Sequence, residues 1–227
     1  MTGLLGGWLA ADATAFFQLL LSQPLVGGAL AGAVWGDAYS GMQVGALLQL
    51  FALAGLPLGG RTPEDYASAG IVGPTIALYL RHVLTTSSFA APLVCGTAAG
   101  LVTALVGRLL VRWLRARNIG LAHWLDDELH QGRAGAIDAA HALGVFHAFA
   151  IGAGFVLAST VALAACARSL VAFDALAVER ASTLAEPALW GLGAGLAVRQ
   201  LVAGGRHTRI LFLAALVFWV AVRWLGR

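Results

Sequence analysis

Apolar residues dominate the first part of the chain, but helix-breaking and polar residues divide them. Residues 4–35 are apolar for longer than the roughly 20 residues that a membrane-spanning helix needs. The pair Gln23-Pro24 interrupts this run, and a proline inside a helix removes a hydrogen bond and kinks the chain. The pattern therefore predicts a spanning or re-entrant pair of helices at 4–22 and 24–36, with one kinked helix as the alternative.

The next apolar runs differ in length. Residues 41–56 are apolar, and residues 56–68 concentrate the proline, glycine and acidic residues of a loop. The run 67–80 is short, which favours a half-span or re-entrant segment. A polar connection at 81–88 leads to a full-length span at 89–107.

Residues 108–141 form the largest polar segment. Leucine and tryptophan recur at helical spacing within it, so we expect an amphipathic helix over 113–141 that lies on the membrane surface or against a partner. The segment opens with four arginines, which the positive-inside rule places on the cytoplasmic side. They are Arg108, Arg112, Arg115 and Arg117.

Three further spans are predicted, at 142–167, 187–204 and 208–226, with an outside loop at 168–186. The expected fold is an all-α integral membrane protein: a multi-span helical bundle with broken or re-entrant helices in its N-terminal third. The sequence predicts a single domain over 1–227. It contains a substrate element at 10–75 and scaffold spans at 89–227.

Glycines repeat at intervals of four in the broken region. Small residues on one helix face let two helix backbones approach closely in a membrane. We therefore expect two close-packing faces. They consist of Gly28, Gly32 and Gly36, and of Gly41 and Gly45.

Composition agrees with a membrane protein and excludes several chemistries. Charged residues make up 11% of the 227 residues, against about 25% in a soluble domain. The net charge of +3 is spread over loops, so we expect no nucleic-acid partner. The histidines and cysteines lack a compact ligand spacing, so neither a metal nor another cofactor is expected. The motifs of serine hydrolases, zinc proteases and nucleotide-binding loops are absent from the sequence.

Polar side chains at the breaks are the candidate binding groups. Ionisable groups at membrane depth are costly, which makes Asp12 and Asp37 candidates. Neutral amides lie near the same breaks, and an amide both donates and accepts hydrogen bonds, as a sugar hydroxyl does. The amides are Gln18, Gln23, Gln43 and Gln49.

These residues also form a recognisable series of motifs over residues 10–75. The series resembles the IIC subunit of the mannose/fructose/sorbose family of the phosphoenolpyruvate-dependent sugar phosphotransferase system (PTS). It begins with Asp12, Thr14, Ala15 and Gln18, followed by Ser22-Gln23-Pro24-Leu25-Val26. It continues with Gly36-Asp37, Gly41, Gly45, Leu48-Gln49-Leu50, Gly59-Gly60 and Pro63-Glu64-Asp65, where Glu64 replaces a proline of the family pattern.

The resemblance implies a multi-pass permease subunit of the bacterial inner membrane. It would bind and translocate a hexose-type sugar in an oligomeric complex with a IID membrane subunit. The subunit itself would be non-catalytic, with phosphoryl transfer on cytoplasmic IIA and IIB proteins. The expected sugar-binding residues are Asp12, Gln18, Gln23, Asp37, Gln49 and Asp65. The expected structural positions are Pro24, Gly28, Gly32, Gly36, Gly59, Gly60 and Pro63.

Two other functions remain open on the sequence. One is a non-transporting scaffold or regulatory subunit of an incomplete phosphotransferase system. The other is a membrane enzyme that uses Asp12 and Asp37 as a buried carboxylate pair, although no activating partner residue is evident.

Overall fold

Helices make up most of the described part of the chain. The computed structural model describes residues 1–15, 18–55, 62–84, 88–203 and 210, and none of them lies in a strand. The prediction of an all-α fold is confirmed. The helices are α1 (Thr2–Thr14), α2 (Pro24–Val34), α3 (Ala38–Leu53), α4 (Tyr66–Leu84), α5 (Ala90–His130) and α6 (Ala136–Ala203).

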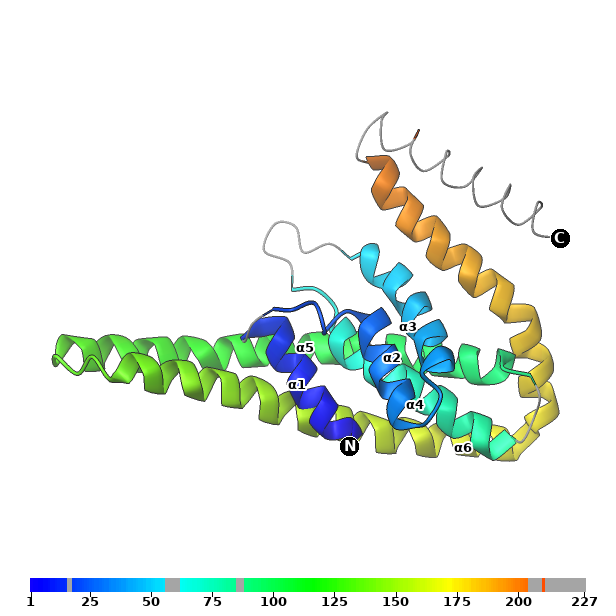
Figure 1. Cartoon of the computed structure of the whole chain (residues 1–227), viewed down its shortest axis with the longest axis horizontal. Coiled ribbons are helices and arrows are strands. Elements are labelled where there is room, and N and C mark those ends of the chain that lie inside the picture. The colour runs from blue at the N-terminus through cyan, green and yellow to red at the C-terminus, as the bar shows by residue number, and fades with distance from the viewer. Residues whose placement is uncertain (16–17, 56–61, 85–87, 204–209, 211–227) are drawn as a thin grey trace.

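Helix α4 forms the centre of the bundle and contacts each of the other five helices (Figure 1). Every residue from Ala67 to Leu78 is buried. The helix is longer than the predicted half-span 67–80, because Arg81 and His82 extend its last turn. Cations at a helix C-terminus interact favourably with the helix dipole, so these polar residues do not end the helix.

The break at Pro24 is confirmed, but the helix before it is shorter than predicted. Helix α1 ends at Thr14, and the backbone adopts left-handed φ values of 52° at Gln18 and 64° at Leu20. Asp12 stabilises this connection, because its two carboxylate oxygens accept hydrogen bonds from the backbone N–H groups of Leu19 (2.7 Å) and Ser22 (3.0 Å).

Helices α2 and α3 pack backbone to backbone through four of the predicted glycines. A β-carbon at Gly28 would lie 2.6 Å from the Gly41 carbonyl oxygen and 2.8 Å from the Gly45 Cα. A β-carbon at Gly32 would meet Asp37 and Gly41 just as closely. Side chains at these positions would force the helices apart, because real β-carbons essentially never approach other heavy atoms this closely.

Gly36 does not belong to this packing face. A β-carbon there would have nothing within 4 Å, and the residue adopts a φ of +80°. A positive φ is favourable for glycine, and Gly36 turns the chain from α2 into α3. Its regular spacing from Gly28 and Gly32 had predicted that Gly36 would share their packing face. Helix α2 ends at Val34, so Gly36 lies beyond it.

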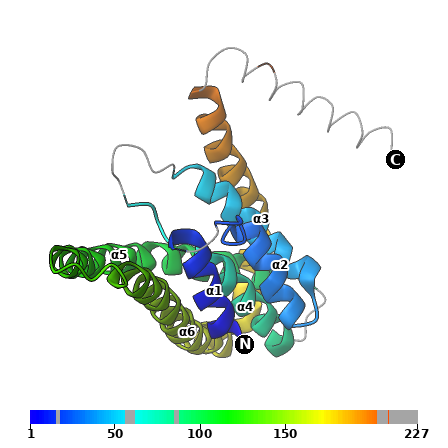
Figure 2. The same cartoon turned by 60° about the vertical axis from the view of Figure 1, so that its left-hand side comes forward.

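Helix α5 continues through the segment that was expected to begin a separate helix. It runs without interruption from Ala90 to His130, so the predicted boundary after residue 107 is wrong. Residues 108–130 contain no proline, and their six leucines and four arginines are good helix formers. Together with the start of α6 this half of α5 forms a long hairpin that projects from the bundle (Figures 1 and 2).

Helix α6 also replaces a predicted loop. The segment 168–186 is helical except at Asp174, where φ is −158° and ψ is 89°. The Asp174 carboxylate accepts a hydrogen bond of 2.8 Å from the Ala177 N–H and so caps the helix that follows. After this bend the second half of α6 runs beside α3, where Gln200 donates a hydrogen bond of 2.8 Å to the Ala54 carbonyl oxygen (Figure 1).

Two of the described helices, α5 and α6, are long and apolar enough to cross a membrane. They contain the predicted span 142–167 and nearly all of the predicted spans 89–107 and 187–204. The predicted span 208–226 lies outside the described residues, apart from residue 210.

Candidate functional site

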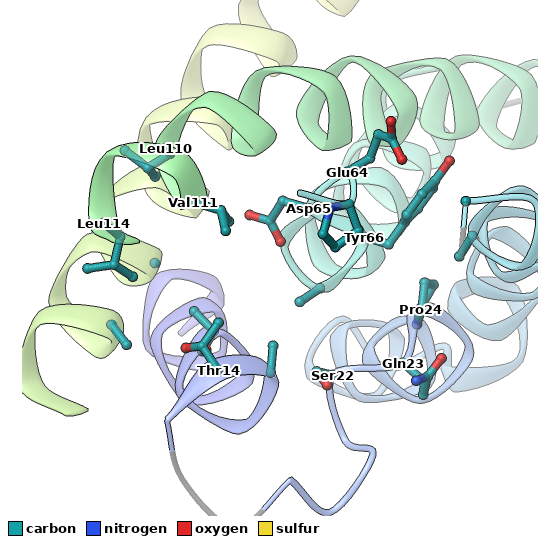
Figure 3. Close-up of a pocket in the computed structure, with 18 of the residues that line it drawn as sticks. Thr14, Ser22, Gln23, Pro24, Glu64, Asp65, Tyr66, Leu110, Val111 and Leu114 are labelled. Atoms are coloured by element: carbon teal, nitrogen blue, oxygen red, sulfur yellow. The ribbon is translucent and has the colours of Figure 1, made fainter. Parts of the chain in front are cut away.

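A cavity of about 370 Å³ lies where helices α2 and α4 begin. Side chains from α1 and α5 close its other sides, as the labelled Thr14, Val111 and Leu114 show in Figure 3. Most of the lining is apolar, with a few polar groups, which is typical of small-molecule sites. The polar or charged lining residues are Thr14, Ser22, Gln23, Gln49, Glu64, Asp65, Tyr66 and Arg115.

Two amide side chains meet at one wall of the cavity. Gln49 on α3 donates a hydrogen bond of 2.8 Å from its Nε2 to Oε1 of Gln23. The Oε1 atom of Gln49 accepts a longer bond, 3.4 Å, from the N–H of Leu25. Gln23 is the N-cap residue of α2. The NH2 group of Gln23 and the remaining lone pairs of the two amide oxygens are therefore available to a ligand.

The irregular segment 62–65 forms the opposite wall and runs antiparallel to α5. The Asp65 N–H donates to the Ala104 carbonyl oxygen (3.0 Å). Its carboxylate accepts hydrogen bonds from the Ser68 hydroxyl (2.6 Å) and N–H (3.1 Å), so Asp65 caps the start of α4. The neighbouring Glu64 forms an ion pair of 3.5 Å with Arg108.

Gly107 allows this wall to approach α5. A β-carbon at Gly107 would lie 2.6 Å from the Asp65 β-carbon and 2.7 Å from its carboxylate. Because Gly107 has no side chain, the Asp65 carboxylate can lie directly against the helix.

The structure brings together part of the predicted binding set. Gln23, Gln49 and Asp65 line the cavity, as do the predicted structural residues Pro24 and Pro63. Asp12 does not line it, but its hydrogen bond to Ser22 holds the residue next to Gln23. Gln18 is exposed and is not part of the lining. The predicted Gly59 and Gly60 lie outside the described residues.

Asp37 lies at the other end of α2 and α3. It caps α3 by accepting a hydrogen bond of 3.0 Å from the Ser40 N–H, and it forms an ion pair with Arg81 of α4. Arg81 also donates to the Ser40 hydroxyl (2.7 Å). At about 1.5 Å per residue, the length of α2 separates Asp37 from Gln23 by roughly 20 Å. In this structure Asp37 connects the α2–α3 turn to α4.

Several lining residues were not among the predicted binding residues. Thr14, Ser22 and Glu64 all belong to the motif series that carried the family resemblance, so that series already marked them. Arg115 was predicted only as part of a cytoplasmic arginine cluster. Tyr66 carried no signal beyond its place at the end of the predicted loop.

A second cavity, of about 570 Å³, lies between α1 and α6. Its lining is apolar and aromatic except for His141, with Trp8, Phe146 and Phe149 among the residues that form it. Among the described residues, no group of three or more histidine, cysteine, aspartate or glutamate side chains has an arrangement that would hold a metal ion.

A family model and a solved structure both match nearly the whole chain. The family model described as "PTS system sorbose-specific iic component" matches residues 2–221. A solved structure titled "Structure of membrane protein" superposes with a TM-score of 0.68 at 18% sequence identity, over 99% of this chain and 91% of that one. At this identity the likeness concerns the fold alone. No curated protein matches the chain.

Proposed function

Because the chain belongs to the family of the sorbose-specific IIC component of the phosphotransferase system, we propose that it is the subunit that binds and translocates sugar. The family is membrane-embedded and serves sugar uptake. The observation that carries the proposal for this chain is the amide pair Gln23 and Gln49 in the wall of the cavity.

The cavity suits a monosaccharide of hexose type. Its volume of about 370 Å³ falls at the lower end of the range of small-molecule sites, roughly 300–1,000 Å³. Gln23 and Gln49 offer both donors and acceptors, which match the mixed character of sugar hydroxyls. The Asp65 carboxylate accepts from Ser68 and has lone pairs left for a sugar hydroxyl.

The broken backbone around the cavity supports a transport role. Non-helical backbone at membrane depth is tolerated where it is buried in protein or lines a cavity. In many transporters, interrupted helices form the substrate site near the bilayer midplane. Here α2 and α4 both begin at the cavity, after the irregular segments 18–23 and 62–65. We propose that the closely packed hairpin of α2 and α3 moves against α4 during alternating access.

A IID membrane subunit is the partner that we propose for the exposed surface of α6. The most apolar 18-residue window of this helix is only 11% buried within the chain. In a bacterial inner membrane, such an apolar surface is covered either by lipid or by a second membrane subunit. In this proposal the chain is a multi-pass protein in an oligomeric IIC–IID complex. The phosphoryl group comes from cytoplasmic IIA and IIB proteins.

Reconstitution of uptake tests the proposed function. The chain would be expressed with IID, IIA and IIB proteins in a bacterium that lacks sugar uptake systems of this type. We expect radiolabelled L-sorbose or a related hexose to accumulate as its phosphate ester, and we expect omission of this chain to abolish the accumulation. Accumulation at the same rate without the chain would contradict the proposal.

A further inference from the structure

Polar groups that line the cavity contact α5 at successive positions along the helix. The segment 62–65 runs antiparallel to this helix, so its residues meet successive turns. Asp65 lies against Ala104 and Gly107, and Glu64 pairs with Arg108. Thr62 lies against Arg115, with 3.5 Å between its hydroxyl oxygen and Nη1 of the arginine. The carboxylates therefore lie towards one end of this contact and the Arg115 guanidinium towards the other.

Arg115 is a cation in the cavity lining. No carboxylate in the described part of the chain pairs with it. Arg108 forms its ion pair with Glu64, whereas Arg115 makes no ion pair with any described residue. Its hydrogen bond to Thr62, at 3.5 Å, is longer than the roughly 2.7–3.2 Å of ordinary N–H···O hydrogen bonds and is therefore weak. Arg115 is also exposed, whereas Gln23 and Gln49 are half-buried. The cavity thus leads from the amide pair outwards to an arginine at its open end.

The nearby carboxylate does not prevent an anion from binding there. Along α5, Arg115 lies about 12 Å beyond Gly107, the residue that faces Asp65. At this distance the repulsion between Asp65 and an anion at the exposed end is weak, because it falls with distance and with the high dielectric of the surrounding water.

We propose that the open end of this cavity binds the phosphate group of a phosphorylated sugar. This inference rests on the proposed function, since a phosphotransferase system releases its sugar as a phosphate ester. The sugar ring lies at Gln23 and Gln49, and the phosphate lies on the guanidinium of Arg115. A guanidinium matches phosphate geometry with two parallel hydrogen bonds, which makes arginine the preferred residue for this recognition.

The predicted orientation of the chain is consistent with this assignment. Arg115 belongs to the cluster of Arg108, Arg112, Arg115 and Arg117, which the positive-inside rule places on the cytoplasmic side. A phosphate site at that end of the cavity would hold the product on the side where it is released. The neutral sugar would depend on the amide pair and Asp65 and not on Arg115, so the two ligands differ in their dependence on Arg115.

Binding measurements with matched variants test the proposal. The full-length chain, co-purified with its IID subunit, would be placed in nanodiscs of neutral phosphatidylcholine at low ionic strength. Calorimetry would give dissociation constants for L-sorbose, L-sorbose 1-phosphate and inorganic phosphate. The variants are Arg115→Gln, Arg115→Lys and Arg117→Gln. Arg117→Gln is the control, because it removes the same charge from the same helix but does not line the cavity. Arg117 instead stacks on Trp113.

We expect the phosphate ester to bind more tightly than the neutral sugar in the wild-type chain. Arg115→Gln should lower this preference by about tenfold or more, as expected for loss of a charged hydrogen bond. Arg115→Lys should retain part of it, and Arg117→Gln should retain all of it. An unchanged preference in Arg115→Gln, or an equal fall in Arg117→Gln, would overturn the inference.

Two further outcomes separate this inference from the proposed function. If neither L-sorbose nor its phosphate ester binds the wild-type chain, both are overturned. Repeating the measurement with anionic phosphatidylglycerol distinguishes a lipid headgroup from the sugar phosphate. If the chain retains this lipid through Arg115 but binds no sugar phosphate in the neutral nanodiscs, the sugar phosphate assignment is overturned while neutral sugar binding stands.

Discussion

Replacing Gln49 by leucine is expected to lower sugar uptake by about 100-fold. The substitution removes the donor to Gln23 and the acceptor for the Leu25 N–H, and it also removes groups that would contact the sugar. Each polar group that is buried without its partner costs roughly 1–3 kcal/mol, and each 1.4 kcal/mol corresponds to a factor of about ten. Initial uptake rates at a sugar concentration well below saturation would measure the effect.

The matched control for this prediction lies on the same helix. Gln43→Leu makes the same chemical change on α3, but Gln43 does not line the cavity. Uptake by the Gln43→Leu variant should stay within about twofold of wild type when the two are expressed equally. Equal uptake by the Gln49→Leu and wild-type proteins would show that the amide pair does not bind the sugar.

Replacing Asp12 by alanine is expected to cause the largest loss of stability among the polar residues near the cavity. Asp12 is only 6% exposed, and its carboxylate holds the N–H groups of Leu19 and Ser22. Leaving two N–H groups without their acceptor costs roughly 2–4 kcal/mol. For a protein of this size that corresponds to a fall in melting temperature of about 10 °C. Thermal unfolding of the purified protein in detergent would measure the shift.

Two further variants separate this role from a simple change of charge. Asp12→Asn retains an oxygen acceptor and should fall between the wild-type and Asp12→Ala proteins. Asp138→Ala removes an exposed carboxylate from the first turn of α6, where surface substitutions usually change stability by no more than about 0.5 kcal/mol. The Asp12 account is wrong if Asp12→Ala and Asp138→Ala melt at the same temperature.

The sequence predicted the features of the fold that depend on local chemistry. Pro24 has no N–H and a fixed φ, and it begins α2 as expected. The glycine spacing in α2 and α3 predicted close helix packing, and four of the five glycines make it. The choice of Gln23 and Gln49 followed from amides near helix breaks, and Asp65 came from the motif series of the family. The structure places all three at one cavity.

Features that depend on tertiary partners were not predictable in this way. Asp37 was selected because a carboxylate near a membrane segment is costly, but its neighbour Arg81 lies 44 residues further along the chain. Arg115 joined the cavity only because residues 62–65 fold back along α5. No local sequence pattern carries any of these long-range contacts.

The position of a bound sugar is the most direct test of the central claim. An experimental structure of the complex with the transported sugar would show which groups contact its hydroxyls. The account predicts a sugar in the cavity at the start of α2 and α4, with a hydroxyl oxygen about 2.7–3.2 Å from the side-chain amide of Gln49. A sugar bound beside Asp37, or in the second cavity between α1 and α6, with no contact to Gln49, would contradict it.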